Sequence, residues 1–217
     1  CFSFHEQKNI STLGEGGMFI VKDPQIAKAV PGVRHNGLTA FQGPRERYWV
    51  PAMSNVDEFW PGQWPQNFCI GEAQCALGSV QLRSVIPNNE ILIEQDRKIR
   101  AALADVPEIS FPEILPGHRY VVHQYVLHFD GSAFGKNRND LLDLVTATYG
   151  VRAIVQYHPL YRYPLFQKLG AGEHNTPVLD GWWDNSFSLP WWCGISDEEL
   201  AIMTDAIRGA IAELKAA

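Results

Sequence analysis

Residues 1–17 read CFSFHEQKNISTLGEGG, and they say more about this chain than any other segment does. A single lysine, Lys8, stands between an aromatic-rich start, with Phe2 and Phe4, and a glycine-rich turn at 14–17. An amine that loses hydration among apolar rings is neutral part of the time, and it can then attack a carbonyl. By itself, a lysine in a loop is more often a solvated surface residue. The segment therefore offers Lys8 as a candidate nucleophile beside that simpler alternative.

Three segments of the chain resemble one enzyme family. They are Ser-Phe-His-x-x-Lys-Asn-(Ile)-x-Thr-x-Gly-Glu-Gly-Gly at 3–17, PQNFCIGEAQCALG at 65–78, and SDEEL at 196–200 before an amphipathic helix. In this order they are similar to the DegT/DnrJ/EryC1/StrS family of sugar aminotransferases, which use pyridoxal 5'-phosphate. Two departures stand out, because Cys69 replaces an arginine that is usual in the family and the segment 40–64 is longer than usual.

The resemblance implies an α/β fold of the aspartate-aminotransferase type, the type I fold of pyridoxal phosphate enzymes. Residues 1–70 would be the back part of the cofactor-binding large domain, with a long loop at 33–66. Residues 71–104 would form linking helices, and 105–217 the small C-terminal α/β domain. Family members are roughly twice this length, near the size at which chains divide into domains. We therefore expect the carboxyl-terminal half of an aminotransferase, catalytically incomplete by itself.

The resemblance also implies roles for three side chains. Lys8 would form the Schiff base with pyridoxal 5'-phosphate, and the hydroxyl of Ser3 would donate to the cofactor phosphate. Asn67 would reach across a dimer interface to the phosphate of the neighbouring subunit's cofactor. Simpler interpretations stay open, because a serine can close its own backbone turn and an asparagine before a helix can cap it.

Two histidines are weaker candidates for contact with substrate or cofactor. His5 precedes Lys8 by three positions, where it would line the cofactor pocket or tune the lysine. His158 precedes Pro159 in a region that faces substrate in the family. A lone histidine is more often a hydrogen-bonded structural residue, and we favour that interpretation for His158.

The segment Gln42–Trp64 is a candidate substrate lid. It contains Arg45, Arg47, Tyr48 and Trp49, and two arginines can clamp a phosphate or a carboxylate. Long ordered loops are usually functional. Packing against a partner subunit is the favoured alternative for this segment.

The expected activity follows from the family. Such an enzyme moves an amino group from glutamate or glutamine to a keto-sugar, a nucleotide-linked keto-sugar or a cyclitol ketone. The expected partner is a second copy in a homodimer, or the N-terminal half of the same enzyme. Two alternatives come from other classes: a non-catalytic regulator that senses the cofactor, and a fragment that serves only as a dimerisation module.

Composition argues against several other classes of protein. The net charge is −6 and no basic run is present, so a nucleic-acid partner is not expected. No apolar stretch approaches the length of a membrane span, and no signal-like start is present, so a cytoplasmic protein is expected. Cys1, Cys69, Cys75 and Cys193 show no C-x-x-C spacing, which favours reduced thiols over a metal site.

The periodicity predicts alternating helices and strands after the lysine segment. The final helix has the strongest signals, since Ser196 is a good N-cap and Glu199 completes a capping box. Its apolar face comprises Leu200, Met203, Ile207, Ile211 and Leu214. The other predicted elements are a buried strand at 17–21, a helix from Asp23–Pro24 to about 31–32, helices at 71–84 and 90–104 separated at Pro87, strands at 118–130 and 151–157, and a helix at 137–149 capped from Asn137 or Asn139.

Overall fold

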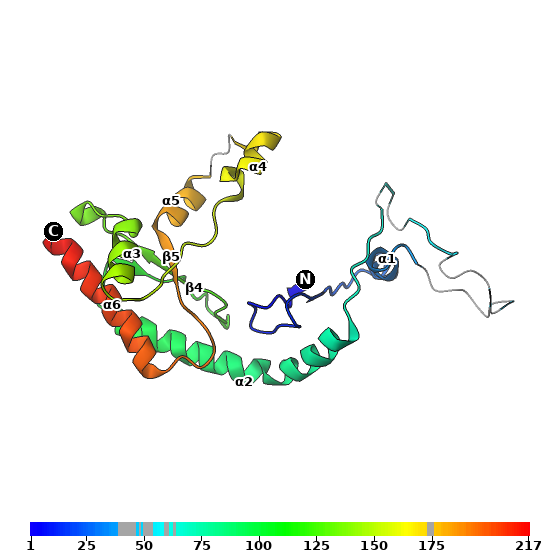
Figure 1. Ribbon diagram of the computed structural model, residues 1–217, viewed down its shortest axis with the longest axis horizontal. Helices are drawn as coiled ribbons and strands as arrows, with labels where there is room; N and C mark the ends of the chain where they lie inside the picture. Colours follow the sequence, from blue (N-terminus) through cyan, green and yellow to red (C-terminus); the bar gives the residue numbers. More distant parts are fainter. Residues whose placement is uncertain (39–46, 48, 50–53, 59–60, 63, 173–175) are drawn as a thin grey trace. The chain divides into compact units, whose positions relative to one another are not determined.

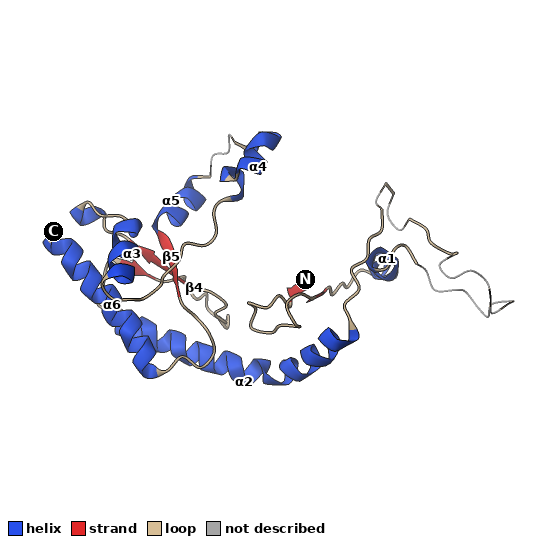
Figure 2. Cartoon of the chain, viewed as in Figure 1, coloured by secondary structure: helices blue, strands red, loops and turns tan. Residues whose placement is uncertain are grey.

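The computed structural model describes residues 1–38, 47, 49, 54–58, 61–62, 64–172 and 176–217. They form two compact units, Cys1–Val85 and Ile86–Ala217. Figure 1 follows the chain from its N- to its C-terminus, and Figure 2 separates its helices from its strands. Within this described part, no helix combines the length and the apolar character needed to cross a lipid bilayer.

The first unit contains a short hairpin and the start of a long helix. Its elements are β1 (Phe2–Ser3), β2 (Gly17–Met18), α1 (Pro24–Arg34) and the N-terminal part of α2 (Glu72–Ala102). Strands β1 and β2 are antiparallel, with Phe2 opposite Met18 and Ser3 opposite Gly17. The hairpin therefore joins the two ends of the lysine segment.

The predicted start of α1 is confirmed and its predicted end is wrong. The Asp23 carboxylate accepts hydrogen bonds from the backbone N–H groups of Gln25 and Ile26, and the helix then continues past Pro31 to Arg34. The buried strand predicted at 17–21 is also wrong. Strand β2 has two residues, since its partner β1 is equally short. Beyond it, Phe19 and Ile20 are 52% and 62% exposed.

Helix α2 runs through Pro87, where a break was predicted. A proline removes one helical hydrogen bond and adds a steric cost, yet 31 consecutive residues keep the helix. The chain therefore leaves the first unit and enters the second within one helix. Of the apolar side chains at 90–104, Ile99 and Leu103 are buried, whereas Ile91 is 44% exposed.

The second unit is a small antiparallel sheet covered by helices. Sheet order is β3-β4-β5, with Ile109 opposite Phe129 and Leu127 opposite Phe187. The elements are β3 (Ile109–Ser110), β4 (Tyr125–Phe129), η1 (Ser132–Phe134), α3 (Arg138–Ala147), η2 (Leu160–Arg162), α4 (Pro164–Phe166), η3 (Gln167–Ala171), α5 (Pro177–Asn185), β5 (Ser186–Leu189) and α6 (Asp197–Ala216).

Two predicted strands shorten in the structure. The segment 118–130 contributes only β4, whose residues alternate between buried and half-buried as a strand with one core face should. The segment 151–157 makes a single antiparallel bridge, between Ile154 and Ser188, so the predicted strand there is wrong. Strand β5 lies between β4 and this bridge, and all four of its residues are buried.

The core of the second unit joins α2, the sheet, α3 and α6. Figure 1 shows α6 beside the C-terminal half of α2, where Gln95 Nε2 donates to the Ile195 carbonyl at 3.0 Å. The predicted caps of α3 and α6 are confirmed, with capping boxes at Asn137 and at Ser196. The predicted inner face of α6 is also confirmed, because all five of its apolar residues are buried: Leu200, Met203, Ile207, Ile211 and Leu214.

Candidate active site

The lysine segment folds into a closed loop, here called the lysine loop (residues 4–16). The Phe4 N–H donates to the Gly16 carbonyl at 2.8 Å, and the Glu6 N–H donates to the Gly14 carbonyl at 2.7 Å. Across the loop, the Thr12 N–H donates to the Phe4 carbonyl at 3.0 Å. These bonds fix the backbone on both sides of Lys8.

Lys8 lies in a tight turn near the middle of this loop and is half-buried. Its backbone N–H donates to the His5 carbonyl at 2.9 Å. A lysine on a closed and partly shielded turn has fewer positions available to its amine than one on an open loop. The loop therefore suits a lysine that must meet one atom of a ligand.

Ser3 lies on β1 at the entrance to the lysine loop, with its side chain exposed. Its Oγ accepts a hydrogen bond from the His5 N–H at 3.4 Å, which is the backbone turn considered as an alternative for this residue. A hydroxyl that accepts one bond still has a proton to donate. The turn and a contact with phosphate are therefore compatible.

His5 is held by two groups of its own loop. Its Nδ1 accepts from the Gln7 N–H at 3.2 Å, and its Nε2 lies 3.8 Å from Oε1 of Glu15. An accepting Nδ1 places the proton of the neutral ring on Nε2, where it faces the carboxylate. His5 thus connects the two arms of the lysine loop.

Asn67 lies in the segment that leads into α2. Its backbone bridges to His35, and its Oδ1 accepts from the Cys69 N–H at 3.0 Å. Helix α2 begins only at Glu72, so the interpretation of Asn67 as a helix cap is wrong. The Nδ2 hydrogens are the groups that Asn67 can donate to an anionic ligand.

Cys69, at the position where the family has an arginine, makes a backbone contact instead of an ion pair. Its Sγ lies 3.8 Å from the Arg34 carbonyl, and the side chain is exposed. A neutral thiol cannot replace the charge of a guanidinium.

A cavity of about 920 Å³ lies beside the lysine loop within the first unit. Its walls come from the hairpin, from α1 and from the segment 68–74. Most of the lining is apolar, with Glu15, Arg34 and Gln74 as polar members. Pockets of this character can hold small molecules, but Ser3, Lys8 and Asn67 are not among the residues that line this one.

His158 belongs to the second unit, in an aromatic cluster. Its ring meets Tyr163 and Trp183 edge-on, with centroids 5.2 Å and 5.1 Å apart. Such edge-to-face pairs are stabilising contacts in their own right. The geometry fits the structural interpretation favoured for this histidine.

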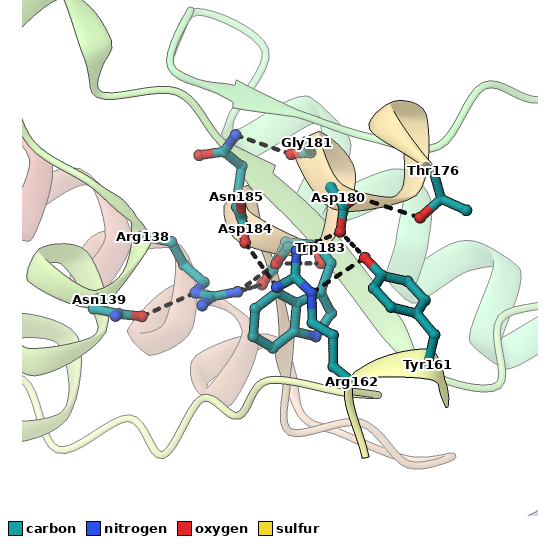
Figure 3. Close-up of polar contacts among 11 residues, drawn as sticks. Arg138, Asn139, Tyr161, Arg162, Thr176, Asp180, Gly181, Trp183, Asp184 and Asn185 are labelled. Carbon is teal, nitrogen blue, oxygen red and sulfur yellow. Dashed lines mark hydrogen bonds and ion pairs between the residues drawn. The ribbon is translucent and has the colours of Figure 1, made fainter. Parts of the chain in front are cut away.

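The same cluster carries a polar network that sequence analysis did not single out. Figure 3 shows Arg162 and Tyr161 directed at the carboxylate of Asp180, and both donate to its Oδ1. Arg138 donates to the Trp183 carbonyl at 2.5 Å and to the Ser186 carbonyl at 3.0 Å. These contacts join η2, α3 and α5 around one indole ring.

The candidate lid falls largely outside the described residues. Gln42, Arg45 and Tyr48 are not among them, so the structure does not bear on the proposed clamp. Arg47 and Trp49 are described, and the guanidinium of Arg47 lies over the ring of Trp49, 5.0 Å from its centroid.

The residues of the first unit fit pyridoxal phosphate. An aldehyde needs an amine, which Lys8 supplies, and a phosphate needs N–H and O–H donors, which Ser3 and Asn67 supply. The two segments that carry them pack closely at Gly16, where an added Cβ would lie 3.2 Å from Cδ1 of Ile70.

Comparisons with known proteins identify the family. A model of the DegT/DnrJ/EryC1/StrS aminotransferase family matches residues 1–208. The spore coat polysaccharide biosynthesis protein SpsC of Bacillus subtilis is 24% identical over 212 residues, which cover 97% of this chain and 53% of the relative. The dTDP-4-dehydro-2,3,6-trideoxy-D-glucose 4-aminotransferase of Saccharopolyspora spinosa is 24% identical over 219 residues, covering 97% and 51%.

A solved structure shares the fold. PseC of Helicobacter pylori, an aminotransferase involved in the biosynthesis of pseudoaminic acid, aligns with a TM-score of 0.80 at 21% identity over 98% of this chain and 53% of its own. The chain thus has the type I fold of aminotransferases that use pyridoxal phosphate, as predicted. It spans about half the length of the curated relatives that it matches. Because the family model extends over residues 1–208, this chain belongs to the DegT/DnrJ/EryC1/StrS aminotransferase family.

Proposed function

We propose that this chain is part of a pyridoxal-phosphate-dependent sugar aminotransferase and that Lys8 is its catalytic lysine. The observation that carries the proposal is the closed lysine loop, which holds Lys8 half-buried with Ser3 at its entrance. Family aminotransferases use pyridoxal phosphate. When bound, this cofactor acts as the electron sink that lets a proton leave the α-carbon of an amino acid.

The side chains of this site have separate tasks. The Nζ of Lys8 would hold the cofactor aldehyde and would carry a proton from the α-carbon of the amino donor. Ser3 Oγ and Asn67 Nδ2 donate to the phosphate, which fixes the cofactor without adding charge. In our proposal Asn67 serves the cofactor of the neighbouring subunit in a homodimer, and His5 and His158 remain weaker candidates for substrate contact.

The proposed substrates are glutamate or glutamine as amino donor and a nucleotide-linked keto-sugar, or a related keto-sugar or cyclitol ketone, as acceptor. The name of the Saccharopolyspora spinosa relative supports a nucleotide-linked 4-keto-sugar. We further propose that residues 1–70 belong to the cofactor-binding domain, 71–104 to a linking segment formed mainly by α2 and 105–217 to the small domain, in a cytoplasmic enzyme. The remaining half of the fold would come from the same enzyme.

A borohydride experiment tests the role of Lys8. The protein that carries this chain is incubated with pyridoxal phosphate, reduced and digested, and the modified lysine is identified by mass spectrometry. We expect the adduct at Lys8 and its loss in Lys8→Arg. Lys22→Arg, which changes an exposed lysine of the same unit, is the matched control and should keep the adduct.

Two outcomes separate the rival functions. An adduct at Lys8 without amino transfer to any keto-sugar would favour a cofactor-sensing regulator. An adduct confined to surface lysines such as Lys22 would remove the assignment of Lys8.

A further inference from the structure

Thr12 has the most enclosed side chain among the described residues of the first unit. Among the described residues of Cys1–Val85, it is the only one besides glycines that is buried, with 1% of its surface exposed. In folded proteins, apolar side chains are buried far more often than polar ones such as threonine. A lone polar residue in that position calls for an explanation from its contacts.

The polar half of Thr12 closes the lysine loop. Its N–H donates to the Phe4 carbonyl at 3.0 Å, and its Oγ1 donates to the Glu15 carbonyl at 3.1 Å. Gly16 lies so close that an added Cβ would be 2.1 Å from Oγ1. Only a glycine leaves room for this hydroxyl.

The apolar half of Thr12 meets helix α2. A Cβ added to Gly78 would lie 2.9 Å from Cγ2 of Thr12, closer than two such carbons can approach. The methyl group therefore packs against the backbone of α2 at Gly78, where no side chain intervenes. The two branches of one threonine thus face different partners, the loop on one side and α2 on the other.

Lys8 occupies the centre of the segment that Thr12 closes. Phe4 and Thr12 each stand four positions from Lys8, and the bond between their main chains joins the two ends. A shift of Thr12 relative to Gly78 would carry the whole turn with it. The position of the lysine relative to α2 therefore depends on this one buried residue.

We propose that Thr12 is a positioning residue for Lys8, with its hydroxyl closing the lysine loop and its methyl group seating the loop on α2 at Gly78. The inference rests on the proposed role of Lys8 as the cofactor lysine. It assigns to Thr12 and Gly78 a joint function that neither has alone. Misplacement of a reacting group by about 1 Å can lower the reaction rate by a large factor. A contact that fixes the lysine loop on α2 therefore supports catalysis.

The first test needs no cofactor. Hydrogen–deuterium exchange of the lysine-loop amides and the acetylation rate of Lys8 relative to Lys22 are measured in the protein that carries this chain. Thr12→Val keeps the shape and removes the hydroxyl, so we expect about tenfold faster loop exchange and a changed Lys8 rate. Thr12→Ser keeps the hydroxyl and loses the methyl group, so its exchange should lie between that of the parent and that of Thr12→Val. Ser79→Ala, beside Gly78 on α2, is the matched control and should change neither quantity.

A double variant tests the seat on the helix. Gly78→Ala should speed loop exchange severalfold, because its Cβ meets the Thr12 methyl group. Adding Thr12→Ser removes that methyl group and should slow exchange again, to the rate of Thr12→Ser alone. This rescue would not occur if Gly78→Ala acted only through helix propensity, where alanine is favourable.

Repeating the borohydride experiment with the Thr12 variants separates this inference from the proposed function. We expect Thr12→Val to lower the yield of the borohydride-fixed adduct at Lys8 severalfold and Thr12→Ser to lower it less. If the parent forms no adduct at Lys8, the proposed function fails, while exchange and acetylation still decide whether Thr12 positions the lysine. Unchanged loop exchange and unchanged Lys8 acetylation in Thr12→Val would overturn the inference, as would failure of the double-variant rescue.

Discussion

The guanidinium of Arg162 lies over the indole ring of Trp183, 4.8 Å from its centroid. A second arginine, Arg138, lies 5.2 Å from the same centroid. Cation–π contacts strengthen as their groups lose water, and Arg138 is only 6% exposed. The ring is therefore the point at which η2, α3 and α5 are joined.

Replacing Arg138 should be costly. In Arg138→Met the Trp183 and Ser186 carbonyls lose their charged donor, and we expect a loss of about 2–4 kcal/mol of unfolding free energy. The measurement is urea denaturation of the variant and parent. Arg97→Met is the matched control, since Arg97 is an exposed partner of Glu94 and should change stability by about 0.5 kcal/mol or less. Equal losses in both variants would contradict the role given to Arg138.

Asp180 should make stability depend on acid pH. Hydrogen bonds from Tyr161 and then from Arg162 hold the pKa of Asp180 below its ordinary 3.8. Since the folded pKa is the lower one, the ionised carboxylate stabilises the fold above about pH 4, and this contribution is lost as pH falls through the folded pKa. Asp180→Asn should remove that part of the dependence. The difference between the parent and variant stability curves, measured by denaturation across acid pH, should shrink as pH falls; a constant difference would contradict the prediction.

His158 should tolerate an aromatic replacement. Its ring meets Tyr163 and Trp183 edge-on, which phenylalanine can reproduce. We expect His158→Phe to change stability by less than about 1 kcal/mol and His158→Ala to cost about 1–2 kcal/mol. Steady-state kinetics then separate the two interpretations of this residue. A His158→Phe enzyme with intact stability and a much higher KM for the keto substrate would show a substrate contact instead.

Signals carried by neighbouring residues made α3, α6 and the start of α1 predictable. The caps at Asp23, Asn137 and Ser196 are completed within three residues, so the sequence contains all the required groups. The apolar spacing of α6 likewise needs no distant partner. The family resemblance singled out Lys8 because its motif is contiguous.

Features that depend on distant partners were missed. Strand β5 reads Ser-Phe-Ser-Leu, a pattern typical of a half-exposed strand, yet β4 and the Ile154 bridge bury Ser186 and Ser188 as well. Thr12 was likewise indistinguishable from an ordinary loop threonine, because its burial comes from Gly78 on a helix far along the chain. The short pairing of β2 was missed for the same reason.

The lysine loop contains a strained residue that can be relieved. Leu13 has φ of +56°, in the left-handed region that disfavours side chains other than asparagine, aspartate and glycine, and it is 65% exposed.

Leu13→Asn should therefore stabilise the protein by about 0.5–1 kcal/mol, since asparagine tolerates this conformation without the entropy cost of glycine. Ile20→Asn is the matched control, because Ile20 is 62% exposed, belongs to the same unit and lies outside the residues with positive φ. The readouts are the free energy of unfolding and amide exchange at Glu6 and Thr12, the residues whose N–H groups close the loop. Slower exchange in Leu13→Asn alone is expected, because the strain opposes the bonds on either side of Leu13. Equal effects of the two substitutions would mean that the gain came from removing an exposed apolar side chain and that the loop stores no strain.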